Sequence, residues 1–425
     1  MGVPASTAAV AAVASGLLPA LRASDVRPEE AFRGRSQGAG VRRRPVGLIA
    51  QVVMSLVLLF VAGSFLRGLD QLQHTAPGFE VVGRLYAHTA LPAASGDRDR
   101  RQQFYDQAVE RLRAVPGVDR VALTSVLPLI PSGSECVSPT AAISLTTTAS
   151  EVSDGYFATL GIPVMAGREF TAASLASQQE SVIINESLAR LAWPNDSAVG
   201  KPVELGCGPR RRAVVVGVAR DTAVRRIGER ARPHLYLQIM RQSGGSFTTI
   251  VLATSGEPSS LTRSVNDTLA SMGQGLKVYE VLPLSVSVEQ SYAAPRWLTR
   301  VLTACGVLAL VLASVGLFGI TAHRVSQRTQ EIGVRMALGA RRRDVFRQVL
   351  GEGLAIVIVG VALGELVSLG LTGVAASVLE GAAGTAGLST HLAVAAIWLA
   401  VAACACYLPA AWASGVDPVV ALRHD

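Results

Sequence analysis

Charged and aromatic residues are scarce in this sequence of 425 residues: 16% are Asp, Glu, Lys or Arg, and 5% are Phe, Trp or Tyr. Half of the residues are hydrophobic, and the mean hydropathy is +0.38. The chain is therefore too apolar for an ordinary soluble protein, but too polar to consist only of membrane spans. This composition predicts several membrane spans together with one water-soluble domain.

The sequence motifs of nucleotide-binding and catalytic sites are missing. The phosphate-binding pattern G-x-x-x-x-G-K-[ST] occurs nowhere, since "SAVGKPVEL" lacks the first glycine and has Pro202 in place of the hydroxyl residue. There is no nucleophile elbow, zinc-binding helix or dinucleotide fingerprint. The six His residues match no metal-ligand spacing. The sequence therefore predicts no catalytic residue, no cofactor and no metal site.

The five Cys residues are too few for a disulfide framework. Cys305, Cys404 and Cys406 lie in apolar runs and are expected to be small core residues. Cys136 and Cys207 lie in the polar middle of the chain, and they are the candidates for a disulfide if that region faces an oxidising compartment. Whether they pair is left open by the sequence.

Four apolar runs are long enough to cross a bilayer, which takes about 20 residues of helix. They are residues 45–67, 297–322, 349–376 and 392–413. Buried helices of a soluble protein are the alternative, but four such runs, each nearly free of charge at its centre, argue against it. The pattern predicts a membrane α-helical fold with four transmembrane helices.

The distribution of arginine around these runs predicts their orientation. Seven arginines lie between Arg22 and Arg44, before the first run, and seven more lie between Arg324 and Arg347. The turn "EGAAGTAGLST" between the third and fourth runs has no basic residue. Because cytoplasmic loops collect Lys and Arg, both arginine-rich segments are expected in the cytoplasm. This also accounts for much of the net charge of +8, so nucleic acid is not expected as a partner.

The polar insert between the first two runs, 68–294, has the pattern of a folded α/β or α+β domain. Segments such as "SVIIN", "RAVVVGVAR" and "FTTIVLAT" are rich in β-branched residues and predict strands. In "DRRQQFYDQAVERLRAV", Phe104, Ala108, Val109 and Leu112 share one helical face. Asn185 is placed to cap the helix "ESLARLAW". The orientation places this domain outside the cytoplasm.

The segment from Arg328 to Gly353 lies between two spans on the cytoplasmic side. Ile332 and Met336 are one helical turn apart, as are Val334 and Leu338, and Gly339 is placed to end the helix in a left-handed cap. Such a helix would present a small apolar surface to a groove on a partner protein, with Glu331 and Arg335 beside it for ionic contacts. Alternatively, it would lie on the membrane, with arginines reaching anionic lipid headgroups. The residues alone leave both interpretations open.

The stretch "RTQEIGVRMALGARRRDVFRQVL" closely resembles the cytoplasmic signature of MacB/FtsX-type ABC transporter permeases. "VSDGYFATLGIPVMAGREFT" and "VVVGVARD" resemble the periplasmic core domain of that family. The resemblance implies an FtsX-like permease domain at 295–425 and a coupling helix at 327–345 that docks on a separate ATPase. The implied contact residues are Glu331, Gly333, Arg335, Met336, Ala337, Leu338, Gly339 and Ala340.

The resemblance also implies a mechanism and partners. In this family a cytoplasmic ABC ATPase moves the coupling helices, and stalks pass the movement to the outer domains for export or extraction of an envelope substrate. The partners would be the ATPase, a second permease copy or paralogue, and lipid of the bacterial inner membrane. "LRGLDQLQHT" and "SVSVEQSYAAPRW" would form the stalk, and Pro295 should bend the second piece.

The beginning of the chain repeats its end. "LLPALRASDVRPEEAFR", from Leu17, matches "YLPAAWASGVDPVVALR", from Tyr407, at nine positions without gaps. The second copy resembles the terminal signature of the family. Residues 1–44 are therefore interpreted as the tail of a preceding permease module, as in the duplicated orphan permeases. Alternative functions are a membrane-anchored scaffold or regulator of envelope enzymes, or an inactive fragment.

Glu365 is the one carboxylate well inside an apolar run, within "GVALGELVSLG". An intramembrane carboxylate is by default a candidate functional residue. It could instead face a helix interface, protonated or bonded to Ser368. The second interpretation is favoured because the residue lies past the middle of the span.

The topology gives a first test. A reporter that is active only outside the cytoplasm, inserted near Gly244, is expected to be active, because both flanking arginine clusters hold the insert on the outer side. A reporter that functions only inside the cell is the matched control and should be silent there. Activity of the cytoplasmic reporter would overturn the orientation.

Overall fold

The structure is a computed structural model, and it describes residues 44–91, 98–130, 133–140, 143–171, 179–239, 247–273, 275–378 and 387–414. The chain divides into two units. Unit 1 is formed by Ala313–Gly360 with the described parts of Met1–Val53 and Ala402–Asp425, and unit 2 by Met54–Leu312 and Val361–Val401. The proposed tail of a preceding module, 1–44, lies outside the described residues except for Arg44, and the repeat at the end of the chain, 407–423, is described only as far as Ser414.

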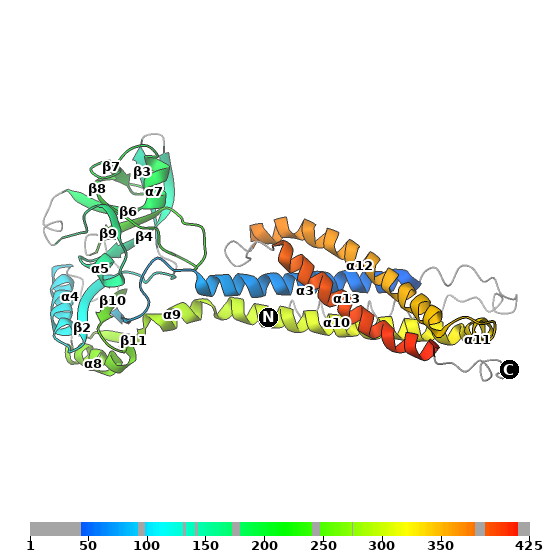
Figure 1. Cartoon of the computed structure of the whole chain (residues 1–425). Coiled ribbons are helices and arrows are strands. Elements are labelled where there is room, and N and C mark those ends of the chain that lie inside the picture. The colour runs from blue at the N-terminus through cyan, green and yellow to red at the C-terminus, as the bar shows by residue number, and fades with distance from the viewer. Residues whose placement is uncertain are drawn as a thin grey trace, which may run out of the picture. The chain divides into compact units, whose positions relative to one another are not determined.

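Four helices are long and apolar enough to cross a membrane. They are α3 (Arg44–His74), α10 (Ala293–Gln327), α12 (Arg342–Val378) and α13 (Leu388–Ser414). Figure 1 shows all four as long helices. The four expected spans are confirmed, and all four helices extend beyond the apolar runs that predicted them.

The segment "SVSVEQSYAAPRW", which was expected to form part of a stalk, is interrupted, but not at Pro295. Helix α9 (Leu284–Ser291) ends one residue before Tyr292, and α10 begins one residue after it. Pro295 is the third residue of α10, where its missing N–H is tolerated because the first turn of a helix has no partner for it. The backbone N–H of Arg296 donates to the carbonyl of Tyr292 (2.9 Å). The two helices therefore follow one another directly, with the break three residues before the expected position.

The inserted domain between α3 and α9 contains one mixed sheet of eleven strands in its described part. The strands are β1 (Arg84–Ala90), β2 (Val118–Thr124), β3 (Gly133–Thr140), β4 (Ile143–Val152), β5 (Val164–Gly167), β6 (Glu180–Asn185), β7 (Pro202–Leu205), β8 (Arg211–Ala219), β9 (His234–Gln238), β10 (Phe247–Thr254) and β11 (Lys277–Pro283). Their order is β11-β1-β10-β2-β4-β3-β7-β8-β6-β9, with β5 paired to β8. Together with the four spans, this confirms the predicted fold class.

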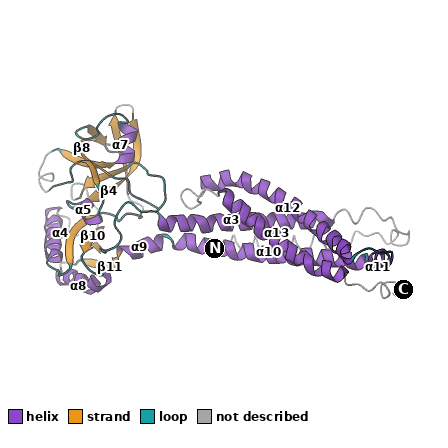
Figure 2. Cartoon of the chain, viewed as in Figure 1, coloured by secondary structure: helices purple, strands orange, loops and turns teal. Residues whose placement is uncertain are grey.

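The sheet has two parts. Parallel pairing of β4 with β9 joins the ends of the run β4-β3-β7-β8-β6-β9 and closes these six strands into a ring. Of the other five strands, β11-β1-β10-β2 form an open antiparallel sheet, and β5 pairs with β8 of the ring. The two parts meet at the pair Thr124↔Val152 of β2 and β4, where the N–H of Ser153 donates to the carbonyl of Leu123 (2.9 Å). The strands of both parts are drawn in orange in Figure 2.

Helices cover both faces of the open part. Helices α4 (Arg98–Arg113) and α8 (Pro258–Ser271) pack on one face, where they lie beside β2, β10 and β11 in Figure 1. Phe104, Ala108 and Leu112 of α4 are buried there with Leu85 of β1, which confirms the predicted apolar face. The short helix α5 (Tyr156–Leu160) packs on the opposite face, where Tyr86 points. Because successive side chains of a strand point to opposite faces, Leu85 and Tyr86 of β1 are buried in two separate cores.

Two side-chain features hold the ring. The Oδ1 of Asn185 accepts hydrogen bonds from the backbone N–H of Leu188 (3.0 Å) and of His234 (2.9 Å), so Asn185 both caps α7 (Glu186–Ala192) and fixes the start of β9. The predicted cap is therefore confirmed. A disulfide joins Cys136 in β3 to Cys207, which follows β7.

His234 is a fully enclosed histidine at the start of β9. It is 2% exposed, its Nδ1 lies 2.7 Å from Thr148 Oγ1, and its ring meets Tyr236 edge-on at 4.6 Å. Burial lowers the pKa of His234 from 6.5 to about 3. The folded domain therefore holds this imidazole neutral at any pH above about 3.

This gives a pH-dependent stability. Below pH 6.5 His234 binds a proton in the unfolded chain but stays neutral in the folded chain. The contribution of His234 to the free energy of unfolding is therefore complete above pH 6.5 and is lost as the pH falls toward 3. The loss approaches about 1.4 kcal/mol per pH unit. His234→Gln should therefore make the thermal midpoint of the full chain in nanodiscs fall less steeply between pH 6.5 and 4. His74→Gln, at an exposed histidine, is the control and should keep the wild-type slope; equal slopes in all three proteins would contradict the prediction.

Candidate functional site

The candidate site is built around α11 (Thr329–Ala337), the short helix between α10 and α12 in unit 1. Ile332 is 9% exposed and Met336 is half-buried, and both pack against Val345 at the start of α12. The other pair of apolar residues faces outward, since Val334 is 43% exposed and Leu338 is 84% exposed. Of the two apolar pairs in the sequence, one therefore anchors the helix and the other is open to solvent or a partner.

Gly339 closes the helix through its backbone conformation. Its φ is +100°, in the left-handed region that favours glycine. The N–H of Gly339 donates to the carbonyl of Met336 (3.1 Å), and the N–H of Ala340 donates to that of Arg335 (3.0 Å). These two bonds are the Schellman pattern of a helix end. The segment 327–345 is thus not one helix, because α11 stops at Ala337 and α12 begins at Arg342.

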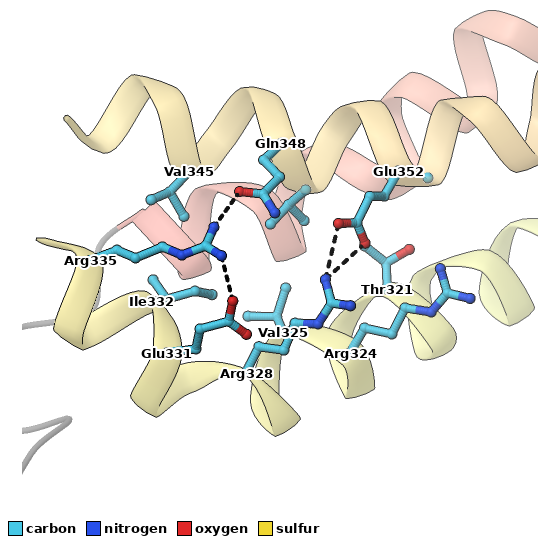
Figure 3. Close-up of a pocket in the computed structure, with 12 residues that line it drawn as sticks. Thr321, Arg324, Val325, Arg328, Glu331, Ile332, Arg335, Val345, Gln348 and Glu352 are labelled. Atoms are coloured by element: carbon cyan, nitrogen blue, oxygen red, sulfur yellow. Dashed lines mark hydrogen bonds and ion pairs between the residues drawn. The ribbon is translucent and has the colours of Figure 1, made fainter. Parts of the chain in front are cut away.

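Polar contacts join α11 to α12 beside the apolar contact. Arg335 pairs with Glu331 (2.6 Å) one turn earlier and donates to Gln348 Oε1 of α12 (3.2 Å). Arg328 donates to Glu352 of α12 at 3.0 Å and 3.3 Å. Figure 3 shows these side chains between the two helices, around a pocket that is also lined by Val325 and Ile332. Exposed pairs of this kind contribute little each, about 0–1 kcal/mol, but their geometry fixes how α11 is rotated against α12.

The predicted contact residues are therefore not equivalent. Ala337, Leu338 and Gly339 are exposed with Val334 and form what we call the outer face of α11. Glu331 and Arg335 lie at its edge and pair with each other. Gly333 is buried, and Met336 and Ala340 are half-buried. The charged and buried members act on the position of α11, and the exposed members are available to a partner.

Glu365 lies in α12 within unit 2, and its environment contains a residue that the sequence did not single out. Its Oε2 is 2.6 Å from Nδ1 of His391 in α13. The Ser368 hydroxyl lies 3.3 Å from Glu365 Oε2 and donates to the Glu365 backbone carbonyl (2.9 Å). The expected bond to Ser368 is present, but the shorter contact is with His391. The sequence could have indicated His391, because it is an ionisable residue directly before the fourth apolar run, 392–413.

No group of three or more His, Cys, Asp or Glu side chains in the described ranges is arranged to hold a metal ion.

Comparison with known proteins agrees with this architecture. The model of the MacB-like periplasmic core domain matches residues 47–268, and the model of the FtsX-like permease C-terminal domain matches residues 304–414. MacB of Rhodopseudomonas palustris (strain BisB18), a macrolide export ATP-binding/permease protein, is 30% identical over 292 residues, which are 64% of this chain and 42% of the relative. MacB of Hahella chejuensis is 26% identical over 336 residues, 75% of this chain and 48% of the relative. The chain thus spans less than half the length of these relatives.

Solved structures are similar to the inserted domain. The periplasmic region of MacB from Actinobacillus actinomycetemcomitans has 15% identity and a TM-score of 0.37, covering 52% of this chain and 98% of that one. The extracellular domain of YknZ from Gram-positive bacteria has 18% identity and a TM-score of 0.32, covering 46% and 100%.

The class of protein is set by four membrane helices, an inserted α/β domain and the two permease domain matches. The chain belongs to the MacB-like periplasmic core domain family and is a permease of the MacB/FtsX ABC type.

The end of α11 gives a local prediction. Gly339→Ala should loosen the Schellman turn, because a left-handed conformation costs a residue with a Cβ about 1–2 kcal/mol. The amides of 338–340 should then exchange with deuterium faster, by up to about ten-fold per 1.4 kcal/mol, in the full chain in nanodiscs. Gly351→Ala in α12 is the matched control: no atom lies within 4 Å of its added Cβ, and Ala favours a helix interior. Unchanged exchange in Gly339→Ala would contradict the role of the turn.

Proposed function

We propose that this permease is moved by a separate cytoplasmic ABC ATPase that docks on the outer face of α11. The observation that supports this most is Leu338, a large apolar side chain 84% exposed at the end of a helix whose opposite side is packed. Exposed apolar residues on a fixed, polar-edged surface are typical of protein interfaces. The curated relatives that the chain matches are named ATP-binding/permease proteins, and the two family matches in this chain cover permease domains only.

The proposed mechanism is transmission of movement along helices. A partner that binds Leu338 and Val334 cannot push α11 without pushing α12, because Ile332 contacts Val345 and Arg335 contacts Gln348. Helix α12 is continuous from Arg342 to Val378. The movement would pass along the membrane helices to the inserted domain, which would change its grip on an envelope substrate for export or extraction.

The remaining partners and the location follow from the same proposal. We infer that the protein works in the bacterial inner membrane with the inserted domain in the periplasm, paired with a second copy or a paralogous permease. The Cys136–Cys207 disulfide supports an oxidising outer compartment for this domain. The arginines at 341–343 are exposed and can meet anionic headgroups at the inner surface while α11 binds its partner.

The test uses a photoreactive amino acid in place of Leu338 in the full chain in its native membrane. Irradiation should attach a protein with an ATP-binding-cassette domain, identified by mass spectrometry, because Leu338 lies in the proposed interface. The same probe at Val82 is the matched control, since Val82 is 89% exposed but belongs to the inserted domain.

Leu338→Asp should abolish co-purification of that ATPase and its stimulation by the permease, because the interface would have to bury a charge. Val82→Asp should change neither. Met336→Asp is a poorer test, since Met336 also packs inside unit 1. Adducts of Leu338 with lipid alone, or a stable complex of Leu338→Asp with the ATPase, would refute the proposal.

A further inference from the structure

A group of polar side chains lies between three membrane helices of unit 2. Glu365 of α12 contacts His391 of α13 at 2.6 Å, and Ser368 lies 3.3 Å from His391 Nδ1. Ser368 is 0% exposed and His391 8% exposed, so these groups face the helices and not the lipid. A carboxylate in an apolar span is costly unless it is paired, so the contact with His391 holds α12 and α13 together.

The third helix, α3, closes this group from the other side. Arg67 donates one Nη1 to both Ser389 Oγ (2.7 Å) and Thr390 Oγ1 (2.6 Å) of α13. Two helical turns earlier in α3, the ring of Phe60 stacks on His391, with ring centres 4.3 Å apart. Between these two contacts α3 carries Gly63, where an added Cβ would lie 3.3 Å from Thr390. Helix α13 thus begins in close contact with α3.

Nδ1 of His391 lies within hydrogen-bond distance of the Glu365 carboxylate, and the Arg67 guanidinium meets the hydroxyls of the two residues that precede His391. One acidic and one basic side chain are thus brought to the same end of α13. Removing the partner of a carboxylate within a span leaves that polar group without compensation.

Helix α3 links this group directly to the inserted domain. Beyond Arg67 it continues to Leu72, which is 6% exposed in the core that also contains Tyr156 and Phe157 of α5. The carbonyl of Leu72 accepts a hydrogen bond from the Tyr292 hydroxyl (3.2 Å), at the junction of α9 and α10. The end of α3 is therefore part of the domain core and not a free linker.

We propose that Glu365, His391 and Arg67 form a polar clasp that fixes the α12–α13 pair onto α3 and passes its movement to the inserted domain. The three are positioning residues, since the contacts that the structure gives them are with side chains of neighbouring helices. The clasp rests on the proposed function, in which movement enters at α11 and travels along α12. It adds the point at which that movement leaves α12 and α13 and enters α3.

The experiment uses the full chain in nanodiscs with the ATP-binding subunit identified by the Leu338 cross-link. Deuterium exchange is compared with and without a non-hydrolysable ATP analogue, in the peptides that contain Leu72 and Tyr292. The wild type should show a nucleotide-dependent difference there. Glu365→His and His391→Glu should each lose it, whereas the double variant that exchanges the two residues should regain it, because the pair is restored in reverse.

Two further variants separate the clasp from a general effect on folding. Arg67→Met keeps the side-chain stem of an exposed residue but removes both hydroxyl contacts, so it should fold and lose the difference. Thr303→Val is the control: the Oγ1 of Thr303 in α10 is buried without a hydrogen-bond partner, so the difference should persist. All variants should keep the Leu338 cross-link.

The outcomes distinguish the two proposals. If the variants keep both the cross-link and the exchange difference, the clasp is wrong and the ATPase coupling stands. If they lose the cross-link as well, the residues support the fold as a whole and the clasp is again wrong. If the wild type itself shows no difference, both proposals fail.

Discussion

A lipid bilayer accepts neither unpaired backbone groups nor isolated charge, and the plan of this chain follows from that constraint. The spans carry almost no charge at their centres, and the polar sheet is confined to an insert between the first two spans. Glu365 is the exception. Its position is possible because α13 brings His391 to it and α3 brings Arg67 to the neighbouring turn. The position of Glu365 is thus also the place where polar side chains connect α3, α12 and α13.

The short helix α11 depends on contacts with its neighbours for its stability. Nine residues are too few for a stable helix in water by themselves. The helix is held by the burial of Ile332 against Val345, by the Schellman turn at Gly339, and by the contacts of Arg328 and Arg335 with α12. Because these contacts use one side and one end, the other side is left for a partner at no cost to the fold.

The sequence was sufficient for features whose cause is local. The apolar runs, the Asn185 cap and the apolar face of α4 each follow from residues within a few turns of one another, and the structure has all three. It was insufficient where the cause is distant. Both apolar pairs of α11 have the same helical spacing, and only the start of α12 decides which of them is buried. Glu365 and His391 are 26 residues apart, and their contact depends on the register between two separate helices, α12 and α13.

The disulfide of the inserted domain is another contact between distant residues that the sequence alone does not predict. Cys136 and Cys207 are 71 residues apart, so no local pattern decides whether they meet. They meet because β3 pairs with β7 in the register Val137↔Leu205, and the N–H of Gly206 then donates to the carbonyl of Cys136 (2.9 Å). The pairing of strands places the two sulfur atoms, and the bond in turn holds that edge of the ring.

The connection between the helices and the inserted domain has a mechanical consequence. A domain on flexible linkers would not respond to a shift of its helices. Here Leu72 at the end of α3 and Leu284 at the start of α9 are buried in one core with Phe157, and Tyr292 joins them through its hydroxyl. A displacement of α3 along α10 must therefore either break this core or move α5 and the strands packed on it. Well-packed cores resist deformation, so the second response would require less energy than breaking the core.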